Sequence, residues 1–117
     1  MDAEKKRALV EAGVNVDGAL DRFMGNEALL CRFLKKFLDD ANFENLKTAI
    51  EQGDEQAALA ASHTLKGVCG NLSMPALFEL FTAQVAAYRA GDARAAAEMM
   101  DKIRPAYDAV CAAIREL

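Results

Sequence analysis

Apolar side chains recur every three or four residues along most of the chain, which is the spacing that gathers them on one face of an α-helix. Glycine, asparagine and aspartate interrupt this pattern at places suited to ending one helix and capping the next. The pattern predicts helices over Ala3–Ala12, from Asp17 to Phe23, from Glu27 to Ile50, from about Glu55 to Leu72, from Ala76 to Ala90 and over Ala93–Leu117.

Single residues refine these helices. Asp17 is expected to cap the short second helix, Asn42 to mark a kink in the long third helix, and Pro105 to bend the last one. The pairs Gly53-Asp54 and Gly91-Asp92 predict two corners between helices. Four long amphipathic helices joined by short corners predict an all-α fold, an up-down four-helix bundle with the short N-terminal helices packed across one end.

The composition supports this fold class. Among 117 residues alanine occurs 24 times, whereas valine, isoleucine and threonine together number 12 and tryptophan is absent, which favours helix over strand. The chain is 53% apolar and 27% charged with a net charge of −4, which is typical of one compact domain over residues 1–117. The acidic balance argues against a nucleic-acid partner, because such binding depends on neutralising phosphates, and favours protein partners.

No segment predicts a membrane span or a signal peptide. The longest stretch without a charged residue, Gly67 to Phe78, is too short to cross a bilayer, and the N-terminal residues are charged rather than apolar. Cys31, Cys69 and Cys111 have neither a disulfide-like nor a zinc-like spacing, so we expect reduced thiols and no bound metal. These features predict a cytoplasmic protein.

The helix that contains the only histidine stands out when it is projected at about 100° per residue. With Leu65 directed to the core, His63 points about 160° away from it, toward solvent. Gly67 and Gly70 lie on the same outward side, and Lys66 flanks them. Each glycine inside a helix costs on the order of 1 kcal/mol relative to alanine, so two outward glycines in an alanine-rich chain indicate that side chains are excluded around the imidazole.

This arrangement suits phosphoryl transfer. Imidazole is a nucleophile near neutral pH, and Lys66, one turn beyond His63, is placed to neutralise an anionic group on the ring. The reaction requires mainly positioning and charge stabilisation, so a partner can supply the metal and the activated phosphate. Each of these residues also has a purely structural explanation. His63 can be a surface histidine without a role, Lys66 a solvated lysine, and Gly70 a residue that loosens the helix before Pro75.

The segment His63-Thr64-Leu65-Lys66-Gly67 resembles the H-x-L-K-G signature of histidine-containing phosphotransfer (HPt) domains. Gly13-Val14, Gly53-Asp54 and Gly91-Asp92 are also similar to family features, so the resemblance covers the whole chain. It implies a phosphoacceptor at His63, with Lys66 assisting and Gly67 leaving room for a receiver domain. It further implies a stoichiometric phosphoryl carrier without kinase activity of its own.

The same resemblance implies the partners. The phosphoryl group passes from a receiver aspartate to the histidine and on to another receiver aspartate, so response-regulator receiver domains and a hybrid sensor histidine kinase are expected to bind. No cofactor is expected on this chain, because the receiver domain brings Mg²⁺. The resemblance favours a monomer.

Further residues are candidate contacts. Thr64 and Asn71 border the outward patch and, with the two glycines, are predicted to contact a partner. Gln84 interrupts an apolar stripe of the next helix, where it either reaches toward His63 or bonds a backbone carbonyl.

The chain departs from the family pattern at three positions. Ser73 stands where a glycine is usual after the signature, and Ser62 replaces a common alanine before the histidine. Val85 aligns with a Gln or Glu that often bonds near the histidine in the family. The sequence therefore does not define what holds the second imidazole nitrogen.

Two alternative functions share these features. A helical adaptor would dock receivers or kinases without being phosphorylated, using the glycine patch for contact only. A phosphoacceptor module of a chemotaxis-type kinase would carry catalytic or dimerising regions, which this chain, ending at Leu117, does not contain. A free-standing protein or an excised domain is therefore the expectation.

Overall fold

The computed structural model describes residues 1–117 and contains eight α-helices and no strand, which confirms the all-α prediction. The molecule measures 43 × 23 × 20 Å along its principal axes. None of its helices combines the length and the apolar character that crossing a membrane requires. The helices are α1 (Ala3–Ala12), α2 (Val16–Arg22), α3 (Glu27–Leu38), α4 (Asn42–Gln52), α5 (Glu55–Asn71), α6 (Pro75–Arg89), α7 (Ala93–Glu98) and α8 (Met100–Arg115).

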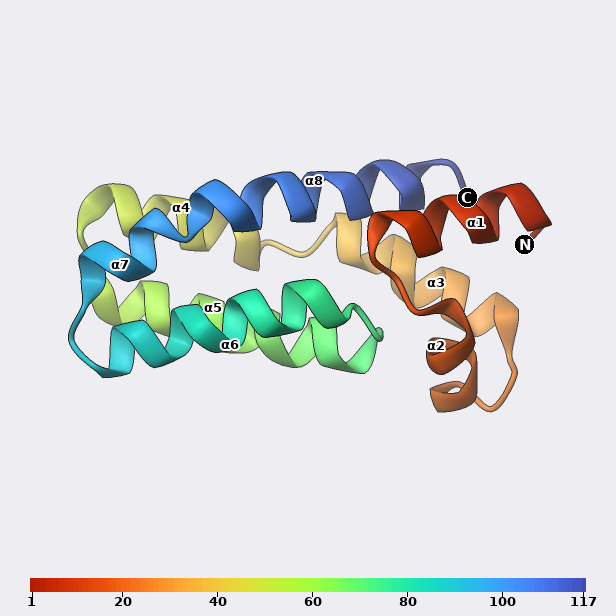
Figure 1. The fold of residues 1–117 in the computed structure, drawn as a ribbon, viewed down its shortest axis with the longest axis horizontal. Coiled ribbons are helices and arrows are strands. Elements are labelled where there is room, and N and C mark those ends of the chain that lie inside the picture. Colours follow the sequence, from red (N-terminus) through yellow and green to blue (C-terminus); the bar gives the residue numbers. More distant parts are fainter.

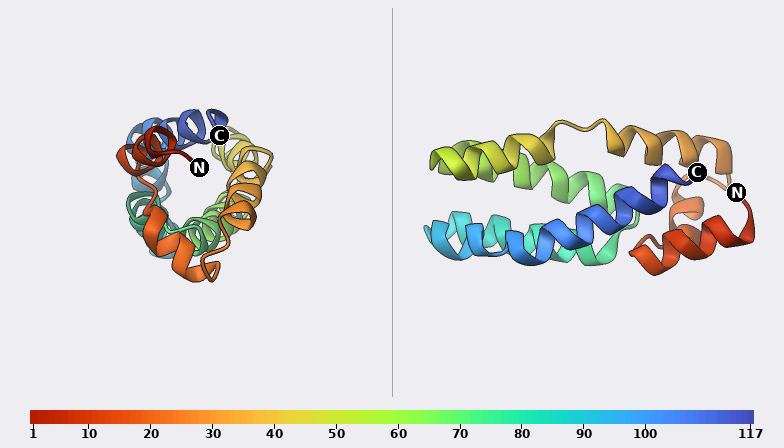
Figure 2. Two further views of the ribbon diagram at one scale, coloured as in Figure 1. Left: turned by 90° about the vertical axis from the view of Figure 1, so that its right-hand side faces the viewer. Right: turned by 90° about the horizontal axis from the view of Figure 1, so that it is seen from above.

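Four arms of alternating direction build an elongated bundle (Figure 1). The first arm is α3 followed by α4, the second and third are α5 and α6, and the fourth is α7 continued by α8. Viewed along its length, the bundle shows the arms around a common axis (Figure 2). α1 lies beside α8, and α2 crosses that end of the bundle. The predicted up-down bundle with additional N-terminal helices is therefore confirmed.

An aromatic cluster joins the first arm to the fourth. The ring of Phe43 on α4 stacks on that of Tyr107 on α8 with centroids 3.8 Å apart, and Phe37 on α3 lies 5.0 Å from the same tyrosine. Aromatic pairs of this kind contribute about 0.5–1.5 kcal/mol beyond the burial of their area. The contact secures both halves of the first arm to one partner inside a core of 24 buried residues.

The first arm is broken where a continuous, kinked helix was predicted. Helix α3 ends at Leu38 and α4 begins at Asn42. The Asp40 carboxylate accepts hydrogen bonds from the backbone N–H of Asn42 at 2.8 Å and from its side-chain amide at 2.7 Å. These bonds form a turn just before α4, whose N-cap, Ala41, has no side-chain capping bond, so the prediction of one helix from Glu27 to Ile50 is wrong.

The last arm is also divided, at Met99 rather than at Pro105. Helix α8 continues through the proline. Proline removes one donor to the carbonyl of Asp101, and since both residues are exposed, water can satisfy that carbonyl. The prediction of one continuous helix over Ala93–Leu117 is therefore wrong, because the helix is interrupted at Met99 and not at Pro105.

Helix α2 begins earlier than predicted, and its cap is Asn15 rather than Asp17. The Asn15 side chain accepts a hydrogen bond from the Gly18 N–H at 3.0 Å. Val16, which is 1% exposed, is thereby drawn into the first turn and into the core. Asp17 instead pairs with Lys6 Nζ at 2.9 Å on the surface.

All three cysteines carry free thiols. Burial, followed by the nearby charges of Asp40 and Cys111, raises the pKa of the Cys69 thiol to about 12. Burial likewise raises the pKa of Cys111. Because the thiolate is the reactive form, Cys69 and Cys111 act as small apolar residues of the core.

Candidate functional site

Helix α5 presents the candidate phosphoacceptor. Asp54 caps the helix by accepting a hydrogen bond from the Ala57 N–H at 3.0 Å, and Leu65 anchors the inner face with no exposed surface. His63 lies on the opposite side and is exposed, as the helical projection predicts. No hydrogen bond or ion pair within the protein involves its imidazole. Both ring nitrogens are therefore open to a partner.

The two glycines of α5 have different surroundings. A Cβ built on Gly67 would meet no atom within 4 Å, so this position is open surface one turn beyond His63. A Cβ on Gly70 would approach the Phe78 ring to 3.2 and 3.3 Å. The interpretation that Gly70 clears space around the imidazole is wrong, because its missing side chain makes room for a ring of α6.

Lys66 also contacts the ring of Phe78. Its Nζ lies 5.9 Å from the centroid of Phe78, at the distance where a cation is attracted to an aromatic face. No carboxylate of the protein pairs with it. The side chain is half-buried and lies on the same helix as His63, three residues further along.

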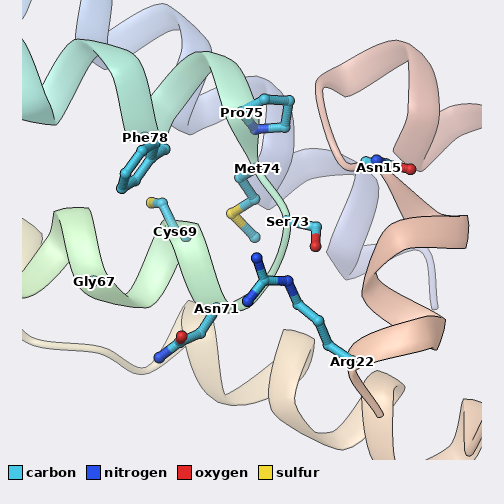
Figure 3. Close-up of a pocket in the computed structure, with 10 residues that line it drawn as sticks. Asn15, Arg22, Gly67, Cys69, Asn71, Ser73, Met74, Pro75 and Phe78 are labelled. Atoms are coloured by element: carbon cyan, nitrogen blue, oxygen red, sulfur yellow. The ribbon is translucent and has the colours of Figure 1, made fainter. Parts of the chain in front are cut away.

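A groove of about 490 Å³ begins beside Gly67 and follows the end of α5. Arg22 extends from α2 toward this end of the helix (Figure 3) and makes no ion pair within the protein. The structure thus brings the predicted contacts Gly67, Gly70 and Asn71 together with a cation that sequence analysis missed. The full lining is Asn15, Arg22, Gly67, Cys69, Gly70, Asn71, Ser73, Met74, Pro75 and Phe78.

Ser73 closes the end of this groove in an unusual conformation. Its φ of 55° lies in the left-handed region, which glycine enters at little cost and other residues enter rarely. A glycine at this position would adopt the same φ without strain. The Ser73 carbonyl accepts a hydrogen bond from the Asn15 N–H at 2.8 Å, so the N-terminal segment is tied to the turn after α5.

A second groove, of about 420 Å³, lies on the other side of α5 and shares Asn71 with the first. Phe33 on its rim is 41% exposed, and Phe78 beside the first groove is 38% exposed. Exposed aromatic rings are typical of protein contact surfaces. The second groove is lined by Phe23, Phe33, Lys36, Phe37, Asp40, Val68, Asn71 and Leu72.

Thr64 does not join these residues. Its hydroxyl donates to the Ala60 carbonyl of its own helix at 3.1 Å. It lines a different groove, between α4 and α5, together with Asn45 and Thr48. The contact of Thr64 with a partner stays a prediction.

Gln84 does not hold the second nitrogen of His63. It has no exposed surface, and its side chain bonds Ser62 and the carbonyl of Ala96 instead. Of the two alternatives raised by the sequence, the bond to a backbone carbonyl is the one observed.

The surface around the end of α5 differs in charge from the protein as a whole. The chain carries a net charge of −4, yet Arg22, Lys36 and Lys66 all lie at the two grooves or at the ring of Phe78. Of the acidic residues, Asp40 lines the second groove, and its carboxylate is engaged by Asn42. No group of three or more His, Cys, Asp or Glu side chains is arranged to hold a metal ion.

Fold and site together define a helical bundle that presents an exposed histidine beside a cleared stretch of helix. A model of the Hpt domain family matches residues 32–115, which include the whole of α5. The chain belongs to the Hpt domain family, whose members are phosphoryl carriers, not kinases, in two-component signalling and interact with receiver domains and kinases. Comparison with curated proteins and with solved structures gives no match.

Proposed function

We propose that His63 carries a phosphoryl group between the aspartates of receiver domains. A lone pair on an imidazole nitrogen attacks the phosphorus of an aspartyl phosphate, the acyl P–O bond breaks, and the receiver carboxylate leaves. In the next transfer a second receiver's carboxylate attacks the same phosphorus and the N–P bond breaks. The observation that carries this proposal is the exposed imidazole of an Hpt domain, next to the open surface at Gly67.

The division of labour follows from which groups this chain contributes. His63 supplies the nucleophile, and Lys66 supplies positive charge for the transferred phosphoryl group. The receiver domain supplies Mg²⁺ and the acyl phosphate, and a hybrid sensor histidine kinase feeds the relay. The protein acts as a monomeric stoichiometric carrier without turnover of its own.

The two grooves that meet at Asn71 support a docking role for this face. The rims carry the aromatic rings of Phe33 and Phe78, which can be desolvated by a partner. Arg22 and Lys36 add positive charge, which complements the acidic, phosphorylated site of a receiver. We assign this surface to receiver docking, with Gly67 at the edge nearest His63.

The test is incubation with a phosphorylated receiver and Mg²⁺. We expect labelled phosphate to appear on the protein, and we expect the label to be acid-labile and alkali-stable, as a phosphorus–nitrogen bond is. Phosphate that survives acid, or that maps to serine or threonine, would reject the proposal.

Lys66→Ala is expected to slow transfer more than it weakens docking. Removing the ammonium withdraws a charge from the transferred phosphoryl group, an effect of about tenfold on the transfer step. Stopped-flow transfer rates and receiver affinities measured in parallel separate the two effects. Lys47→Ala is the matched control, because Lys47 also lies over an aromatic ring, at 5.2 Å from the Phe43 centroid, but belongs to α4. Equal losses of affinity and rate in Lys66→Ala would contradict a role in the transfer step.

A further inference from the structure

Ser62 and Gln84 form a polar contact inside the core. Apart from the tyrosine and cysteine side chains, Ser62 and Gln84 are the only buried polar side chains of the protein. Each has 0% exposed surface. Ser62 directly precedes His63 on α5, whereas Gln84 belongs to α6. No buried side-chain nitrogen or oxygen lacks a hydrogen-bond partner, so the contact is fully satisfied.

The Gln84 amide connects three arms of the bundle. Its Oε1 accepts from Ser62 Oγ at 2.7 Å, and its Nε2 donates to the carbonyl of Ala96 on α7 at 3.0 Å and to Met100 Sδ on α8 at 3.4 Å. Since a backbone carbonyl only accepts, the nitrogen of the amide must face Ala96. The oxygen is then left for Ser62, and the direction of both bonds is fixed by chemistry.

The other inward residues of α5, among them the buried Leu65 and Cys69, turn its apolar face toward the core but set the rotation of the helix only coarsely. Ala58 and Ala61 are small, and apolar contacts are not directional. Gly67 and Gly70 weaken the helix further along. A small turn of α5 about its axis would keep Leu65 in apolar surroundings, but it would break the Ser62 bond and leave a hydroxyl and an amide buried without partners.

We propose that Gln84 is a positioning residue for phosphoryl transfer, acting through Ser62 to fix the rotation of α5 and hold His63 outward. Neighbouring residues of a helix are about 100° apart, so a Ser62 held toward Gln84 directs His63 to the surface. This inference rests on the proposed function of His63.

The first test is Ser62→Ala, which removes the hydroxyl and little volume. We expect the transfer rate inside the complex with a phosphorylated receiver to fall about tenfold, because a misplaced nucleophile loses most of the benefit of positioning. The affinity for the receiver should change by less than about twofold. Val110→Ala is the matched control: it also loses buried atoms, but on α8 beside Gly13, and it should leave the transfer rate unchanged.

A second readout does not depend on phosphate. His63 is the only histidine, so its imidazole gives a single set of NMR signals. In Ser62→Ala we expect these signals and the His63 amide signal to broaden or shift, because α5 then samples more than one rotation, while Val110→Ala leaves them unchanged. If the native protein accepts no phosphate, the proposed function fails, yet the NMR comparison still tests the positioning by Gln84.

The double variant Ser62→Ala/Gln84→Met replaces both hydrogen-bond partners with apolar side chains. We expect it to recover part of the unfolding midpoint that Ser62→Ala loses, because the buried amide oxygen that Ser62→Ala leaves unpaired is removed as well, but we do not expect it to recover the transfer rate. Full recovery of the transfer rate in the double variant would overturn the proposal. So would Ser62→Ala matching Val110→Ala in both transfer rate and His63 signals.

Discussion

His63→Gln is expected to abolish the incorporation of acid-labile phosphate from a phosphorylated receiver. Glutamine has no nucleophilic ring nitrogen, so no N–P bond can form, and the chain has no second histidine to replace it. The side chain makes no contact that supports the fold, so the free energy of unfolding should change by less than about 0.5 kcal/mol. Labelled-phosphate transfer and chemical denaturation, measured on the same preparation, check both statements.

The His63→Gln variant also distinguishes a phosphoryl carrier from an adaptor that is not phosphorylated. Either function predicts that His63→Gln still binds the receiver, because the grooves at Asn71 are untouched. Only the carrier loses a phosphorylation that the native protein shows. A His63→Gln protein that still becomes labelled would identify another residue as the acceptor.

Gly67→Gln is expected to slow phosphoryl transfer by at least about tenfold while making the protein more stable. The new side chain would project from open surface one turn beyond His63, where the receiver must approach. Glutamine also has a better helix propensity than glycine, so the free energy of unfolding should rise by about 0.5–1 kcal/mol. Opposite signs for rate and stability exclude misfolding as the cause.

Gly67→Ala is the control for this experiment. It brings a similar or larger gain in helix propensity with a single methyl group, which meets no atom of the protein within 4 Å. We expect its transfer rate to lie close to that of the native protein. Equal rates for the glutamine and glycine proteins would contradict the steric argument.

The helical period placed His63, Leu65 and Gly67 correctly because orientation on a long helix follows from geometry alone. The position of Gly70 on its helix does not predict its role, and that of Gln84 leaves two alternatives open, because both roles depend on a neighbouring arm. The ring that fills the space above Gly70 comes from α6, and the partners of Gln84 come from α5, α7 and α8. Projection of one helix carries no information about which residues of another helix face it.

The remaining differences also depend on contacts that one helix alone does not show. Asn15 and Asp17 are both good helix caps, and the choice between them is made by the burial of Val16, a tertiary effect. Asp40 is likewise one of several acidic residues in its segment, and only its bond to Asn42 shows where the arm breaks. No feature of the sequence marks Arg22 as part of the site, because its approach to the end of α5 depends on how α2 crosses the bundle.

Residues 1–31 lie outside the segment that the Hpt model matches, yet they build one wall of the groove beside Gly67. The backbone bond between Asn15 and Ser73 attaches this wall to the turn that ends the histidine-bearing helix. Under the proposed function, part of the receiver-docking surface then lies outside the segment that carries the nucleophile. Substitutions at Arg22 can therefore change the charge of that surface without touching the nucleophile or the helix that carries it.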